Sequence, residues 1–149
     1  MFKTEDAPCV IDSWWRAARN TSMFAWVPPK VFARAYRSYI VHALASNTVC
    51  VRIACDPDDQ AQIYGWIAGD AHCVHWVYVK GLYRRNHIAT SLLIDAHPSA
   101  LTGQVKATHW SYACGLAPQY KFTYTPELFF TQSAVAMMRS ASGEKDASD

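Results

Sequence analysis

Two stripes of apolar residues at helical spacing open the chain. Val10, Ile11, Trp14, Trp15 and Ala18 recur every three or four residues, which predicts a helix that ends near Asn20 with Asp6 as its N-cap. A second helix is predicted over about residues 30–46. Its apolar stripe consists of Phe32, Tyr36, Tyr39, Ile40, Ala43 and Leu44. Residues 1–6 are predicted to form a short edge strand.

Three strands are predicted next, over residues 48–54, 63–68 and 72–79, because short apolar runs are separated by strong turn signals. The third run is apolar on both faces, which predicts a central strand. A helix over about residues 86–95 follows. Further strands are predicted at 106–111 and 120–124, and a short apolar helix at 128–139.

This element order predicts an α/β fold with a mixed, mostly antiparallel central sheet flanked by helices. A chain of 149 residues fits one domain. We assign that domain to residues 1–126, and we assign residues 127–149 to a C-terminal extension that ends in a polar tail, which we expect to be disordered in isolation.

Composition adds expectations about partners and location. Only 17% of the residues are charged, and aromatic residues are frequent, so we expect exposed apolar surface and a protein partner or a homo-oligomer, with residues 128–138 as the candidate interface. The net charge of +2 is too small to indicate nucleic acid by itself. No apolar run has the length of a membrane span. The five cysteines contain no CxxC pair, which favours reduced thiols in a cytoplasm.

The strand that ends at Val77 and Val79 leads through a basic turn into a helix. That order places backbone N–H groups and the positive end of a helix dipole at the edge of a sheet, an arrangement suited to a phosphate or pyrophosphate. The turn carries Arg84 and Arg85, which keep it basic. The alternative interpretation is that both arginines lie in a solvated turn before an ordinary core helix.

The segment from Val79 to Ala89 resembles the pyrophosphate loop of the GNAT N-acetyltransferases, Arg/Gln-x-x-Gly-x-Gly/Ala. Arg84 fits the first position and Ala89 the last, while His87 stands where the family usually has its first glycine. The element order fits over residues 1–125, but the motif itself covers only about fifteen residues. The resemblance implies acetyl-CoA as the cofactor. The residues that it assigns to cofactor binding are Val77, Val79, Arg84, Arg85, Asn86, His87, Ile88, Ala89 and Thr90. His87 either binds phosphate through its ring or fills the groove.

The catalytic groups that the resemblance implies are harder to assign. No Glu lies between Asp6 and Glu127, so the usual strand carboxylate is missing. His75 is the candidate base, because the pKa of histidine lies near neutrality, and Tyr112, or alternatively Tyr120, is the candidate for protonating the leaving thiolate. The alternative is a core histidine held by a hydrogen bond and a tyrosine used for packing.

Two functions follow as expectations. The first is an acetyl-CoA-dependent N-acetyltransferase with an unknown amine acceptor. The second is a catalytically degenerate GNAT-fold structural or adaptor component of a larger assembly, such as a bacteriophage virion, as a head–tail or tail protein. The location would be the host cytoplasm or the virion. His72, Cys73, His75 and His109 match no zinc spacing, so no metal site is predicted.

Overall fold

The computed structural model describes residues 2–21, 24–45, 49–101, 104–109, 121–126 and 128. Its α-helices are α1 (Ala7–Arg19), α2 (Pro29–Ala45) and α3 (Ile88–Ala96). Its strands are β1 (Cys50–Cys55), β2 (Ile63–Gly69), β3 (Cys73–Val79), β4 (Gln104–Ala107) and β5 (Lys121–Tyr124). Short 3₁₀-helices are η1 (Thr4–Asp6), η3 (Gly81–Tyr83) and η4 (Pro98–Leu101).

The strands form one open sheet in the order β1-β2-β3-β4-β5. Neighbours among β1, β2 and β3 are antiparallel, whereas β3–β4 and β4–β5 are parallel. The mixed α/β sheet and the central position of β3 are therefore confirmed. The antiparallel ladders are the longer ones, and the parallel β3–β4 pairing follows from the helical crossover through α3.

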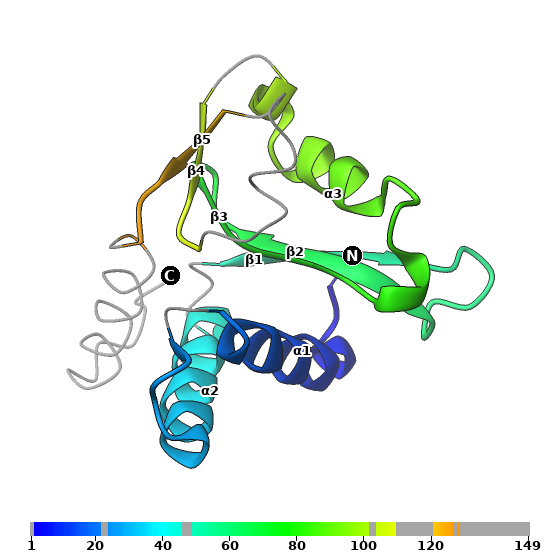
Figure 1. Ribbon diagram of the computed structural model, residues 1–149. Helices are drawn as coiled ribbons and strands as arrows, with labels where there is room; N and C mark the ends of the chain where they lie inside the picture. Colours follow the sequence, from blue (N-terminus) through cyan, green and yellow to red (C-terminus); the bar gives the residue numbers. More distant parts are fainter. Residues whose placement is uncertain are drawn as a thin grey trace, which may run out of the picture.

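Helices cover both faces of the sheet. Figure 1 shows α1 and α2 on one face and α3 on the other. The strands serve both layers because side chains alternate: Trp66 and Ala68 pack toward α1 and α2, and Ile67 packs toward α3.

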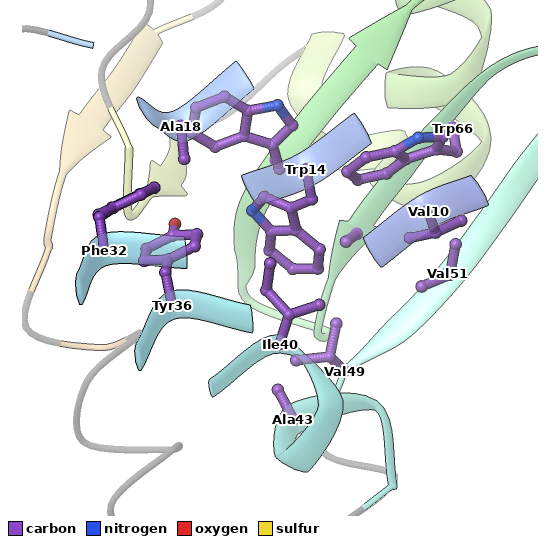
Figure 2. Close-up of a cluster of buried hydrophobic side chains, with 12 residues drawn as sticks. Val10, Trp14, Ala18, Phe32, Tyr36, Ile40, Ala43, Val49, Val51 and Trp66 are labelled. Atoms are coloured by element: carbon purple, nitrogen blue, oxygen red, sulfur yellow. The ribbon is translucent and has the colours of Figure 1, made fainter. Parts of the chain in front are cut away.

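The larger core lies under α1 and α2 and is rich in aromatic residues. Trp14 is fully buried at its centre, and its ring centroid lies 5.4 Å from that of Trp66 (Figure 2). Phe32 and Tyr36 stack at 4.9 Å on the α2 side. The smaller core under α3 is mainly aliphatic. Its buried members are Ile67, Val74, Leu92, Leu93, Ala100 and Val105.

Three expectations about local structure need correction. Of the edge strand expected over residues 1–6, the described residues 2–6 form none: Thr4–Asp6 is a 3₁₀ turn, because the Asp6 carboxylate accepts the Lys3 N–H at 2.8 Å and the Asp6 N–H donates to the Lys3 carbonyl. The expected helix over 86–95 begins two residues later, at Ile88. The strand expected over 106–111 is β4, which ends at Ala107.

No helix in the described ranges is long and apolar enough to cross a membrane. The division at residue 126 stays a prediction, since Leu128 is the only residue described beyond it.

Candidate functional site

The centre of β3 contains a β-bulge at His75. Ala68 of β2 pairs with Trp76, whereas the next residue, Gly69, pairs with Val74, so His75 is one extra residue on β3. The strands approach closely here, because a Cβ on Gly69 would lie 2.4 Å from the Cys73 carbonyl oxygen. Bulges of this kind redirect a strand and are frequent beside functional sites.

Beyond the bulge, one edge of β3 is open in the described part of the chain. β4 pairs with β3 at Cys73 and Val74 alone. Lys80 donates its N–H to Tyr64 of β2 at 2.9 Å. Because backbone polar groups alternate in direction along a strand, those of Val77 and Val79 face away from β2, toward the side of β4. The Val79 carbonyl accepts the Arg84 Nε at 3.2 Å.

The turn from β3 to α3 contains two residues with left-handed backbone. Arg85 has a φ of 69° and His87 a φ of 58°. His87 is the N-cap of α3, and its carbonyl accepts the Ser91 N–H at 2.9 Å. Glycine adopts this conformation most easily, whereas a side chain makes it costly. His87 thus has the backbone conformation of a glycine at the position where the resemblance expects one, and its left-handed backbone delays the start of α3 to Ile88.

Most residues before and within the first turn of α3 are exposed to solvent. His87 makes no side-chain cap hydrogen bond, so the side chain of the N-cap leaves the amide groups of the first turn uncapped. Arg84, Arg85, Asn86, His87 and Ala89 are exposed, whereas Ile88 and Thr90 are half-buried. The side chain of His87 lies on the surface.

The loop is fixed to the β1–β2 turn by contacts that the sequence did not suggest. The Tyr64 and Tyr83 ring centroids lie 4.4 Å apart, and Gln62 Nε2 donates to the Tyr83 hydroxyl at 2.6 Å. Tyr64 in turn donates to the Asp56 carboxylate, which raises the pKa of Tyr64 to about 12 and lowers the pKa of Asp56. These contacts fix η3 to the β1–β2 hairpin. They thereby also fix the start of the loop that contains Arg84 and Arg85.

A shallow hollow of about 240 Å³ lies beside the loop, along α3. Its lining residues are Ala54, Asn86, Ile88, Ser91, Leu92 and Asp95. Asn86 and Ile88 therefore belong both to the predicted cofactor-binding set and to this hollow.

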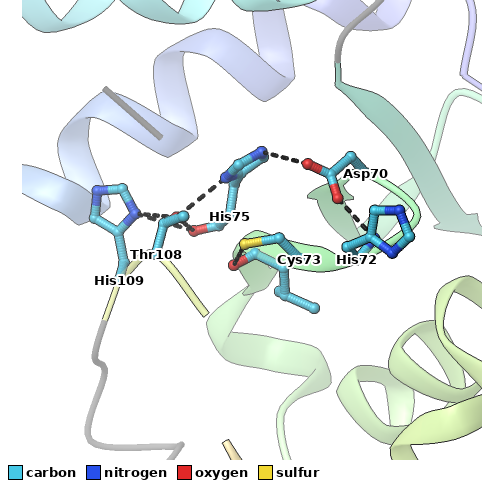
Figure 3. A network of polar contacts seen from close by, with 7 residues as sticks. Asp70, His72, Cys73, His75, Thr108 and His109 are labelled. Carbon is cyan, nitrogen blue, oxygen red and sulfur yellow. Dashed lines mark hydrogen bonds and ion pairs between the residues drawn. The ribbon is translucent and has the colours of Figure 1, made fainter. Parts of the chain in front are cut away.

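His75, the predicted base, lies in a buried polar network (Figure 3). Its Nδ1 is 3.1 Å from the Thr108 hydroxyl, which is 3.0 Å from His109 Nδ1. On the other side, His75 Nε2 lies 3.9 Å from the Asp70 carboxylate. His109 Nε2 is 2.7 Å from the Tyr36 hydroxyl, so the network runs from the β2–β3 turn to α2.

Burial controls the acid–base behaviour of this network. Burial and, to a smaller extent, the nearby His75 lower the pKa of His109 to about 4. Burial also raises the pKa of Tyr36, and it raises the pKa of the Cys73 thiol to about 12, so Cys73 is a poor nucleophile. The side chain of His75 has no exposed surface. A general base must reach the proton it removes, so this geometry is that of a hydrogen-bonded core histidine.

Some predicted features lie outside the described residues. These include Tyr112, Tyr120 and, apart from Leu128, the candidate interface 128–138. Among the described residues, no three His, Cys, Asp or Glu side chains are arranged to hold a metal ion.

The chain was compared with known proteins at three levels. No family model matches it, and neither a curated protein nor a solved structure does.

Proposed function

We propose that this chain is an N-acetyltransferase-like protein of GNAT fold that binds acetyl-CoA where β3 leads into α3. The observation that carries the proposal is the combination of a glycine-like turn with a strand edge that no described strand covers beyond Val74. Val77 and Val79 direct backbone groups away from β2, and eight residues after Val79 the left-handed His87 opens α3. A pantetheine arm needs the strand edge and a pyrophosphate needs the turn.

Different residues are assigned to different parts of acetyl-CoA. Val77 offers a backbone N–H and carbonyl, and Val79 a backbone N–H, to the amides of the pantetheine arm, because the Val79 carbonyl already accepts the Arg84 Nε. The first-turn N–H groups of Ile88, Ala89 and Thr90 face a pyrophosphate, and the guanidinium groups of Arg84 and Arg85 add charge. Acetyl-CoA, when bound, supplies the activated acetyl group. The amine that accepts it is unknown.

A second candidate, a binding or assembly component without catalysis, has its own supporting observation. His75 is buried in a network of side chains, and it is the base that the sequence offers in place of a glutamate. A GNAT-fold protein without an accessible base would serve as a structural or adaptor part, for example of a virion. Turnover of acetyl-CoA by a monomeric chain, seen by mass photometry and thiol release, would exclude this second function.

Isothermal titration of the full chain with acetyl-CoA tests binding. We expect heat and a thermal shift with acetyl-CoA, and weaker binding of pantetheine, which lacks the pyrophosphate. Absence of both signals at millimolar acetyl-CoA would refute the proposal.

Matched variants locate the site. Arg84→Gln with Arg85→Gln should weaken binding at least about tenfold, because charge-assisted hydrogen bonds are lost. His87→Gly should keep binding, since glycine adopts a φ of 58° readily. Arg16→Gln with Arg34→Gln removes the same charge from α1 and α2 and should leave acetyl-CoA binding unchanged.

A further inference from the structure

The outer faces of α1 and α2 carry a strong excess of positive charge that the small net charge of the chain conceals. α2 contains no acidic residue, and α1 contains only Asp12. The basic side chains of the two helices, apart from His42, are Arg16, Arg19, Lys30, Arg34 and Arg37. We call these five side chains the basic face.

Helical spacing and two contacts gather these side chains on one surface. Arg16 and Arg19 follow Asp12 at intervals of four and seven residues, and Lys30, Arg34 and Arg37 have the same spacing on α2. Arg37 Nη1 lies 3.2 Å from the Asp12 carboxylate, which joins the two stripes.

The second contact is at the other end of α1. The half-buried Arg19 guanidinium lies 5.9 Å from the ring centroid of the buried Phe32 and donates to the Phe24 carbonyl at 2.6 Å. Arg19 therefore joins the two helices, and the exposed charge comes from the other four side chains. In the described part of the chain, Arg37–Asp12 is the only ion pair formed by the basic face, so most of its charge is uncompensated.

The turn that connects the two helices of the basic face contains an exposed aromatic residue. Trp26 lies in the turn between α1 and α2 and is 81% exposed. Arginine forks match phosphate oxygens, and an exposed indole stacks on an unpaired base. We propose that the basic face, together with Trp26, binds single-stranded nucleic acid, independently of the acetyl-CoA site on the other side of the sheet.

The packing favours a nucleic acid over an anionic membrane. A helix that lies on a bilayer inserts its apolar face into the lipid. Here the apolar faces of both helices are buried against the sheet, with Trp14 and Ile40 fully buried. A duplex is disfavoured as well, since its bases are already stacked and leave Trp26 without a partner.

Fluorescence anisotropy of the full chain with a labelled oligothymidine of about twenty nucleotides tests the proposal. Binding should weaken with salt, and each lost phosphate contact should reduce the logarithmic salt slope by about 0.7. Arg16→Gln with Arg34→Gln should therefore reduce the slope by about 1.4 and weaken binding about tenfold at low salt. Both side chains are exposed, so the fold should persist, as circular dichroism would verify.

Two further variants separate the contributions. Trp26→Ala should weaken binding about fivefold or more with an unchanged salt slope, because stacking is not ionic. Arg84→Gln with Arg85→Gln is the charge-matched control and should have a much smaller effect. The proposal is overturned if both double variants weaken binding equally, if no binding occurs at low salt, or if the chain binds phosphatidylglycerol vesicles but not the oligonucleotide.

Discussion

The face of the sheet under α1 and α2 and the face under α3 differ in size and chemistry. The first buries three tryptophans, Trp14, Trp66 and Trp76, and ends in the polar network of Tyr36 and His109. The second buries a smaller aliphatic set around Leu92 and Leu93, and α3 begins in an exposed basic loop.

We assign most of the folding free energy to the α1/α2 side of the sheet and ligand binding to the α3 side. Burial of aromatic surface makes the α1/α2 side the main source of folding free energy, since each large ring contributes several times the apolar area of a methyl group. The α3 side leaves backbone groups and charges exposed, which a binding loop requires. The following experiments test this division.

The largest loss of stability is expected from Trp14→Ala. Removal of this fully buried ring should cost about 3–5 kcal/mol in the free energy of unfolding, whereas Leu93→Ala under α3 should cost about 2–3 kcal/mol. Urea unfolding of both variants measures the difference. A larger loss for Leu93→Ala would show that the α3 side dominates.

Acidification should destabilise the α1/α2 side through His109, and burial also lowers the pKa of His97 at the end of α3. The pKa of His109 is lowered to about 4 in the folded protein, so the unfolded chain, in which histidine has a pKa of about 6.5, takes up the proton first. Stability should be full above about pH 6.5 and fall by up to about 3 kcal/mol as the pH approaches 4.

His109→Gln should flatten this dependence between pH 6.5 and 4, and His42→Gln serves as the matched control. Thermal unfolding over the pH series measures both. An unchanged slope in His109→Gln would show that another group controls it.

His87→Val should lower stability by about 1–2 kcal/mol, because a β-branched residue tolerates a φ of 58° poorly. His87→Gly should change stability by less than about 1 kcal/mol, since the relief of strain is offset by the flexibility of unfolded glycine. Differential scanning fluorimetry compares the two. Equal melting temperatures would mean that the turn is not strained.

The smallest effect is expected for Asp95→Asn. The Arg52–Asp95 pair joins β1 to α3 at 2.8 Å, but both side chains are more than half exposed. Such pairs contribute about 0–1 kcal/mol, and less at high salt. Urea unfolding at low and high salt measures the loss. A loss comparable to that of Leu93→Ala would mean that α3 is held by charge rather than packing.

The sequence predicted the described elements of regular structure well, because their signals are local. Stripes such as Val10, Trp14 and Ala18 need only helical spacing to be recognised, and all three are buried. Residues 2–6 were predicted wrongly because the Lys3–Asp6 hydrogen bonds compete with strand formation at a position where the apolar pattern is weak.

The candidate site was only partly predictable. The basic loop and its His87 were visible as a motif, but the contacts that hold the loop join residues far apart in the chain, such as Gln62 and Tyr83. The same is true of His75: its partner Thr108 is thirty-three positions away, and nothing between them signals the contact.

The sequence by itself determined the helices, the strands and the place of β3 at the centre, because spacing and turn residues act over a few positions. Only the tertiary structure decided that His75 is buried, that β4 pairs with β3 only before the bulge in the described part of the chain, and that Arg37 of α2 lies beside Asp12 of α1. Burial and electrostatic potential depend on which distant segments pack together, and a local sequence pattern contains no information about that packing.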